Sequence, residues 1–293
     1  MKISVVHRTT YDYADNVTGS HHEARLTPRD SETQQTISHG ITITPAPEAR
    51  RRRFDYFGNR ALHFSLSEPH RSLEVLAESV VELHALPPPN LQASPAWEDV
   101  RDRLRSDRRR DVLDAYGFSF ASPFVPEVAD ITAYAAPHFE SGRPLLEAVN
   151  HLMHSIFEEF TYDSRATDVS TPLQEVLSGR RGVCQDFAHL AIACLRSQGL
   201  AARYVSGYLL TRPPPGKMKL VGADASHAWF STFVPDHGWV DFDPTNALLP
   251  QGEHVTVAYG RDFSDVTPIR GVILGGGQHR LTVAVDVDQI DEP

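Results

Sequence analysis

The sequence feature that most constrains the fold is an apolar helix that begins at a cysteine. Gly182 and Val183 precede Cys184, and apolar side chains then recur at helical spacing. These side chains are Phe187, Leu190, Ala191, Cys194 and Leu195. The pattern predicts a helix from Cys184 to about Gln198, ended by Gly199. Because a helix N-terminus carries unpaired N–H groups and partial positive charge, it favours a thiolate, which makes Cys184 a candidate nucleophile.

Three predicted strands follow this helix, at residues 202–210, 225–234 and 239–242. Neighbouring antiparallel strands can place His227 beside Asp243, and a helix packed on their sheet can bring Cys184 to the imidazole. Such an arrangement supplies a nucleophile, a base and an acid that orients the base. Asp241 is an alternative to Asp243, since strand alternation puts both on one face.

The first 86 residues or so are rich in predicted strands. Residues 41–44 and 73–83 alternate as strands do, although part of the second segment also fits helical spacing, and 54–64 has the pattern of a hairpin around Gly58 and Asn59. The proline run at 87–89 marks a break, and the charged stretch 97–114 after it is predicted to be a linker or an elaborated loop. Two domains are therefore expected, 1–88 and 89–293, the second with a core at about 155–250.

Within the second domain, helices are predicted at 126–135 and 145–160, and a last strand at 281–287. The proline-rich residues 213–217 are expected to form a mobile connection, with a lid or rim beside the site as one interpretation. Gly275–Gly277 is not followed by the Lys and Ser or Thr of a phosphate-binding loop, so no nucleotide site is expected.

The charge balance indicates which partners to expect. The formal net charge is −10, from 28 basic and 38 acidic residues, which argues against binding to nucleic acids or to anionic membranes. Residues 1–7 contain no long apolar run, so no secretory leader is expected, and no run in the sequence approaches membrane-spanning length. The two cysteines, Cys184 and Cys194, lie on one predicted helix about 15 Å apart, whereas a disulfide needs less than about 7 Å. Both are expected to be free thiols in a reducing cytoplasm, with Cys194 in the core.

A metal site is the main chemical alternative, because the chain has 15 histidines. The pairs His21–His22 and His151–His154 lack a set of partner ligands and the His-Glu-x-x-His spacing of zinc proteases. They are interpreted as solvent-exposed histidines, and neither a metal nor a cofactor is expected.

Several ordered segments together resemble a known superfamily. They are residues 182–190 (GVCQDFAHL), 204–208 (YVSGY), 226–229 (SHAW) and 243–246 (DPTN), with further likeness at 6–13, 260–266 and 268–272. The chain resembles the transglutaminase-like superfamily, and its start resembles the β-rich domain that precedes the core in a bacterial family of that group. The resemblance implies an α+β protein, in which a sandwich-like N-terminal β domain precedes a papain-like core of helices on an antiparallel sheet. It assigns Cys184 as nucleophile, His227 as base and Asp243 as orienting acid.

The activity expected from this resemblance is amide chemistry through a thioester, with a peptide or protein as substrate. Hydrolysis is favoured over transfer to an amine, since the sequence shows no channel for a lysine amine, no calcium loop and no added β-sandwich domains. A non-catalytic binding module is a further alternative. The backbone N–H of Cys184 is expected to contribute to an oxyanion hole, with Tyr162 as a candidate second donor.

Two other features near these motifs have two interpretations each. Asp186 either caps the first turn of the helix or orients an active-site neighbour, and the cap is favoured. Trp229 and Trp239 either pack in the core or form a platform for substrate, and packing is favoured.

Overall fold

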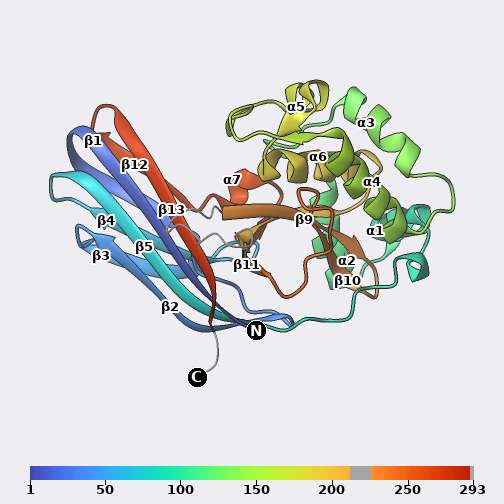
Figure 1. The fold of residues 1–293 in the computed structure, drawn as a ribbon, viewed down its shortest axis with the longest axis horizontal. Helices are drawn as coiled ribbons and strands as arrows, with labels where there is room; N and C mark the ends of the chain where they lie inside the picture. Colours follow the sequence, from blue (N-terminus) through green and yellow to red (C-terminus); the bar gives the residue numbers. More distant parts are fainter. Residues whose placement is uncertain (212–225, 291–293) are drawn as a thin grey trace, which may run out of the picture.

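The computed structural model describes residues 1–211 and 226–290, and its fold is α+β, as expected. A strand-rich part built from both ends of the chain lies beside a part in which helices cover a small antiparallel sheet (Figure 1). The predicted connection at 213–217 lies outside the described residues. Among the described helices, none is long and apolar enough to cross a membrane.

Seven strands make up the larger sheet. They are β1 (Lys2–Ala24), β2 (Gln34–Thr44), β3 (Ala49–Phe54), β4 (Arg60–Leu66), β5 (His70–Leu83), β12 (Ile269–Gly275) and β13 (His279–Ile290). The first half of β1 pairs with β5 and β13, and its second half pairs with β4 and β12. Buried apolar side chains of β1, β2, β4 and β5 form one cluster, so the two halves of the sheet enclose a core of their own, which is the expected sandwich-like arrangement.

Three predictions for this region are confirmed, and one assignment differs. Segments 41–44 and 73–83 lie in β2 and β5, and the hairpin around Gly58 and Asn59 joins β3 to β4. The strands β12 and β13, which were expected to belong with the second domain, instead pair with β1 along almost its whole length. The division at residue 88 stays a prediction, but the chain returns to the first sheet after the core.

The remaining elements are mostly helical. They are α1 (Trp97–Ser106), α2 (Arg110–Tyr116), α3 (Ala129–Ala135), α4 (Leu145–Glu159), α5 (Leu173–Gly179), α6 (Cys184–Ser197) and α7 (Phe263–Val266). The predictions for 126–135, 145–160 and the cysteine helix are confirmed. The prediction of a linker or loop at 97–114 was wrong, because that stretch forms α1 and most of α2. Its many charges conceal a narrow apolar face, Val100, Leu104 and Val112, which is fully buried.

The second sheet positions the candidate site. It contains β8 (Ala202–Leu209), β9 (Ser226–Val234), β10 (Gly238–Phe242) and β11 (His254–Gly260), all antiparallel, in the order β10-β9-β8-β11. Three of these strands were predicted, and β11 was not. Helix α6 packs across β8 and β9 (Figure 1), and every residue of the helix from Asp186 to Arg196 is buried. The helix that begins at Cys184 is therefore fixed against the sheet that carries His227.

The strand β11 forms one edge of this sheet, and side-chain amides from β2 and from the β3–β4 turn cover it. Gln34 donates to the carbonyl of Thr256 at 2.8 Å and accepts from its N–H at 2.7 Å. Asn59 makes the same pair of bonds to Tyr259, at 2.7 Å and 2.8 Å. Each amide thus replaces one residue of a neighbouring strand, satisfying backbone groups that a free edge would leave open. The two parts of the molecule are joined along β11.

Candidate active site

Cys184 is the first residue of α6, and its side chain is half-buried. The turn before it is held by Asp186, whose Oδ2 accepts hydrogen bonds from the Val183 N–H at 2.8 Å and the Thr167 hydroxyl at 2.6 Å. A Cβ on Gly182 would lie 2.7 Å from that same oxygen, so glycine allows the close approach. The favoured interpretation of Asp186 as a cap is confirmed, and the thiol lies where the helix N-terminus carries positive charge.

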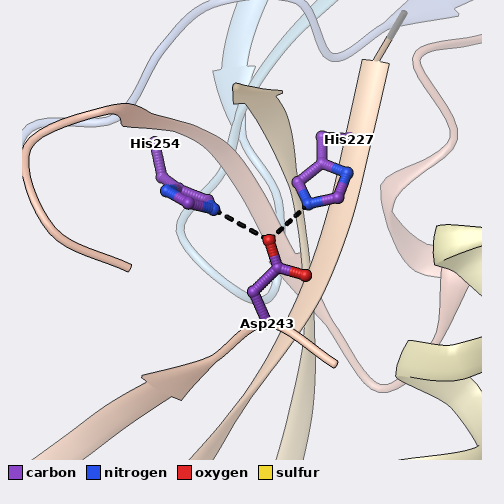
Figure 2. Close-up of side chains that lie close together, drawn as sticks. All are labelled: His227, Asp243 and His254. Carbon is purple, nitrogen blue, oxygen red and sulfur yellow. Dashed lines mark hydrogen bonds and ion pairs between the residues drawn. The ribbon is translucent and has the colours of Figure 1, made fainter. Parts of the chain in front are cut away.

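His227 and Asp243 form a direct pair. Their Nε2 and Oδ2 atoms are 2.7 Å apart, and the carboxylate is completely buried (Figure 2). His227 is the second residue of β9, and Asp243 directly follows β10, in a turn closed by backbone hydrogen bonds with Leu248. The other carboxylate oxygen, Oδ1, accepts from the Thr245 N–H at 3.0 Å. Hydrogen bonds to both carboxylate oxygens thus fix the side chain of Asp243.

The protonation of this pair follows from its surroundings. Burial lowers the pKa of His227, but hydrogen bonds to Asp243 and to Cys184 outweigh burial and raise the pKa to about 10. Burial raises the pKa of Asp243, and its hydrogen bonds to His227 and His254 lower it well below its usual range. At neutral pH the site therefore holds an imidazolium beside a carboxylate. Because Nε2 of His227 faces Asp243, Nδ1 is the ring nitrogen available to the Cys184 thiol.

Asp241 is committed to other partners. Its carboxylate accepts from the Trp229 indole at 3.0 Å and from the Ser231 hydroxyl. The geometry therefore brings Asp243, and not Asp241, to His227. Trp229 is fully buried, and the half-buried Trp239 ring lies 4.3 Å from the Arg203 guanidinium carbon, so both tryptophans pack within the protein.

Two further residues bind Asp243, and sequence reasoning did not identify either. His254 Nε2 lies 3.0 Å from Asp243 Oδ2, and Asn246 Nδ2 lies 2.7 Å from the same oxygen (Figure 2 draws the two histidines). Asn246 was within the matched DPTN segment, so its position was available, although its role was not. His254 begins β11, the strand that the prediction lacked, and nothing in its local sequence distinguishes it.

In the described part of the chain, one group of side chains could hold a metal ion, and it consists of His227, Asp243 and His254. Ligand atoms of His227, Asp243 and His254 lie within 4.8 Å of one another. A tetrahedral ion with bonds of about 2.0–2.1 Å would keep its ligand atoms roughly 3.3 Å apart. The 2.7 Å between His227 and Asp243 is shorter, so the observed geometry suits hydrogen bonds better than metal binding.

Predictions were also made for Cys194, Tyr162 and the paired histidines. Cys194 is fully buried, and burial raises the pKa of its thiol, so it belongs to the core as predicted. Tyr162 pairs with Gly182 in a short parallel ladder, and burial, together with the Cys184 thiol, raises the pKa of its phenol. A part for Tyr162 in the oxyanion hole stays a prediction. Of the histidines expected to be exposed, His22 is instead buried and stacked on Phe64.

Comparisons with known proteins agree with this architecture. Residues 3–82 match the family described as the bacterial transglutaminase-like N-terminal region, and residues 132–244 match the transglutaminase-like superfamily. An uncharacterized protein of Mycobacterium tuberculosis is 43% identical over 297 residues, which covers 97% of this chain and 91% of the relative. A protein of Pseudomonas aeruginosa named protein-glutamine gamma-glutamyltransferase is 32% identical over 110 residues, 36% of this chain and 16% of that protein.

One solved structure shares the fold over the whole chain. It is a candidate cysteine protease from Cytophaga hutchinsonii, with a TM-score of 0.75 and 21% identity, covering 100% of this chain and 92% of that one. Together with the family matches and the full-length relative, this fold identifies the chain as a member of the transglutaminase-like superfamily that carries the bacterial transglutaminase-like N-terminal region.

Proposed function

We propose that the protein hydrolyses a peptide or amide bond through a thioester on Cys184, with His227 as acid and base and Asp243 as the residue that orients His227. The observation that carries this proposal is the buried His227–Asp243 pair at 2.7 Å, together with Cys184 at the start of α6, which contributes to the raised pKa of His227. Such an imidazolium stabilises the thiolate, which is the nucleophilic form of cysteine.

The reaction follows in two halves. The Cys184 thiolate attacks the carbonyl carbon, a C–S bond forms, and the oxyanion accepts hydrogen bonds from first-turn N–H groups of α6, including that of Cys184. The C–N bond then breaks, and the leaving amine takes a proton from Nδ1 of His227. In the second half, water gives a proton to His227 and its oxygen to the acyl carbon. The C–S bond breaks, which releases the acid and restores the thiolate.

Transfer of the acyl group to an amine is the second candidate. It is supported by the relative named protein-glutamine gamma-glutamyltransferase, which matches about a third of this chain. Hydrolysis is preferred because water has access to the site: Cys184 is only half-buried, and Asn246, 3.5 Å from His227 Nε2, is exposed to solvent. The enzymatic step to the thioester is the same for both.

The experiment that separates these reactions uses a peptide library in H₂¹⁸O, with and without a labelled primary amine. We expect products with one ¹⁸O in a new carboxylate, in excess over amine adducts, and no product with Cys184→Ala. The variant Cys194→Ser is the matched control and should keep activity. Amine adducts in excess of hydrolysis would establish the transferase instead, and no turnover together with an unreactive Cys184 would favour a binding module.

We also propose that the protein acts in a reducing compartment such as the cytoplasm. The nucleophile must stay a free thiol, and both cysteines of the chain are free. Fractionation of cells with an antibody to the protein tests this, and recovery from an oxidising compartment would contradict it.

A further inference from the structure

We propose that His254 is a positioning residue of this site: its Nε2–H holds the carboxylate of Asp243 in the direction of His227. The inference rests on the function proposed above and adds a fourth side chain to it. His254 acts through Asp243 and does not reach the thiol.

Three donors converge on a single oxygen of Asp243. Asp243 Oδ2 accepts from His227 at 2.7 Å, from His254 at 3.0 Å and from Asn246 at 2.7 Å. The two histidines approach this oxygen from opposite sides, each from its own strand (Figure 2). A carboxylate with no exposed surface needs such bonds to stay charged, and their directions fix its rotation.

His254 is buried, with Asp243 as its hydrogen-bond partner. Its side chain is 4% exposed, and in the described part of the chain its Nδ1 is buried without a hydrogen-bond partner. The Nε2–H tautomer satisfies the bond to Asp243 and leaves Nδ1 without a proton that would need an acceptor. Asp243 is therefore the polar group to which the His254 ring donates its hydrogen bond.

Neighbouring elements hold the ring of His254 firmly in place. The indole of Trp229 meets it edge-to-face, with ring centroids 5.1 Å apart. The backbone of β11 is fixed two residues later, where the N–H and the carbonyl of Thr256 both bind the Gln34 amide of the first sheet. Asn246, by contrast, is exposed on a turn. His254 is thus the rigid member of the two additional donors, and through β11 it connects the N-terminal sheet to the site.

Loss of this donor should loosen the pair that it supports. Within residues 1–211 and 226–290, the titratable groups facing His227 are Cys184, Asp243 and His254. Without the His254 bond, Asp243 can rotate away from His227, the imidazolium loses part of its stabilisation, and the thiolate loses its counter-ion for part of the time. The titration midpoint of His227 should then move to lower pH.

The test compares three variants of the full chain. His254→Phe keeps a ring against Trp229 and removes the donor, whereas His254→Gln keeps an N–H at similar reach. His22→Phe is the matched control, because His22 is also buried but lies in the first sheet. Two quantities are measured in each: the rate at which iodoacetamide alkylates Cys184 at pH 7, and the titration of His227 by ¹⁵N NMR with labelled histidine.

We expect His254→Phe to alkylate about tenfold more slowly, as for loss of one charge-assisted hydrogen bond, and to show a lower His227 midpoint. His254→Gln should recover most of both quantities, and His22→Phe should match the unmodified protein. A purely structural role for His254 would lower the melting temperature in the phenylalanine variant and leave the His227 midpoint unchanged, which would overturn the proposal.

A rise of the His227 midpoint in His254→Phe would also overturn it, because His254 would then compete with His227 for the charge of Asp243. The proposed function fails separately. If Cys184 of the unmodified protein reacts no faster than Cys194, the catalytic account is wrong, while the His227 titration still decides whether His254 positions the pair.

Discussion

The substitution Asp243→Asn tests the candidate site at the point where it is most tightly packed. It preserves the size of a fully buried side chain and removes its negative charge. The lost interaction is the 2.7 Å bond to His227, one of three that converge on the same oxygen. We expect the variant to lose most of the reactivity of Cys184.

The magnitude follows from the pKa of His227. Its rise from 6.5 to about 10 corresponds to about 5 kcal/mol, shared between Asp243 and Cys184 and already net of burial. Without the carboxylate, burial keeps the imidazole neutral at pH 7, and the thiol has no cation beside it. Loss of one hydrogen bond to a charged group costs about 1.5–3 kcal/mol, so alkylation should slow at least about tenfold.

The assay is alkylation by iodoacetamide, quenched at intervals and read by peptide mass spectrometry. Cys194 serves as an internal reference for unfolding, because it becomes accessible only when the core opens. The matched control is Asp241→Asn, two residues away, in which the amide can still accept from Trp229 and donate to Ser231. The rate at which Cys184 is alkylated in Asp241→Asn should stay within about twofold of that in the unmodified protein, because Asp241 makes no hydrogen bond to His227.

Two results would refute this reasoning. An unchanged rate in Asp243→Asn would mean that the carboxylate does not hold His227 as an imidazolium. An equal loss in Asp241→Asn would mean that the effect comes from general disturbance of β10 and its turn.

Three further predictions concern stability. Asn59→Ala should lower the free energy of unfolding in urea by about 3 kcal/mol, since it leaves both backbone groups of Tyr259 unpaired, and a loss below about 1 kcal/mol would contradict the edge-covering role. Burial lowers the pKa of His7 to about 4, below its value in the unfolded chain, so its contribution to stability is present above pH 6.5 and lost as pH falls towards 4. His7→Gln should therefore make the fall in melting temperature across that range shallower, and an unchanged slope would contradict this. Gly207→Ala would put a Cβ 2.0 Å from the Val255 carbonyl oxygen, so we expect a loss of about 3 kcal/mol or more by urea unfolding, and a variant as stable as the original would contradict the close approach.

The sequence predicted those parts of the site that lie on elements with a regular spacing of apolar residues. The apolar spacing after Cys184 predicted α6, and β-strand alternation predicted β9 and β10, so the thiol, His227 and Asp243 could be assigned to neighbouring elements. Alternation alone left Asp241 and Asp243 equivalent. Only the turn after β10, which directs Asp243 back towards β9, separates them in space.

The features that sequence did not predict depend on contacts between distant residues. His254 reaches Asp243 because β11 pairs with β8, and β12 and β13 return to β1 across more than 240 residues of chain. Such pairings leave no local period. The helices α1 and α2 were missed for a different reason: their apolar faces are narrow and lie within a dense run of charges.

The central claim is that Cys184 is a nucleophile activated by His227, and one measurement tests it without knowledge of the substrate. The rates at which iodoacetamide labels Cys184 and Cys194 are compared near neutral pH, in the unmodified protein and in His227→Ala. We predict that Cys184 is labelled much faster than Cys194, and that His227→Ala removes most of the difference. Equally slow labelling of the two cysteines in the unmodified protein would contradict the account.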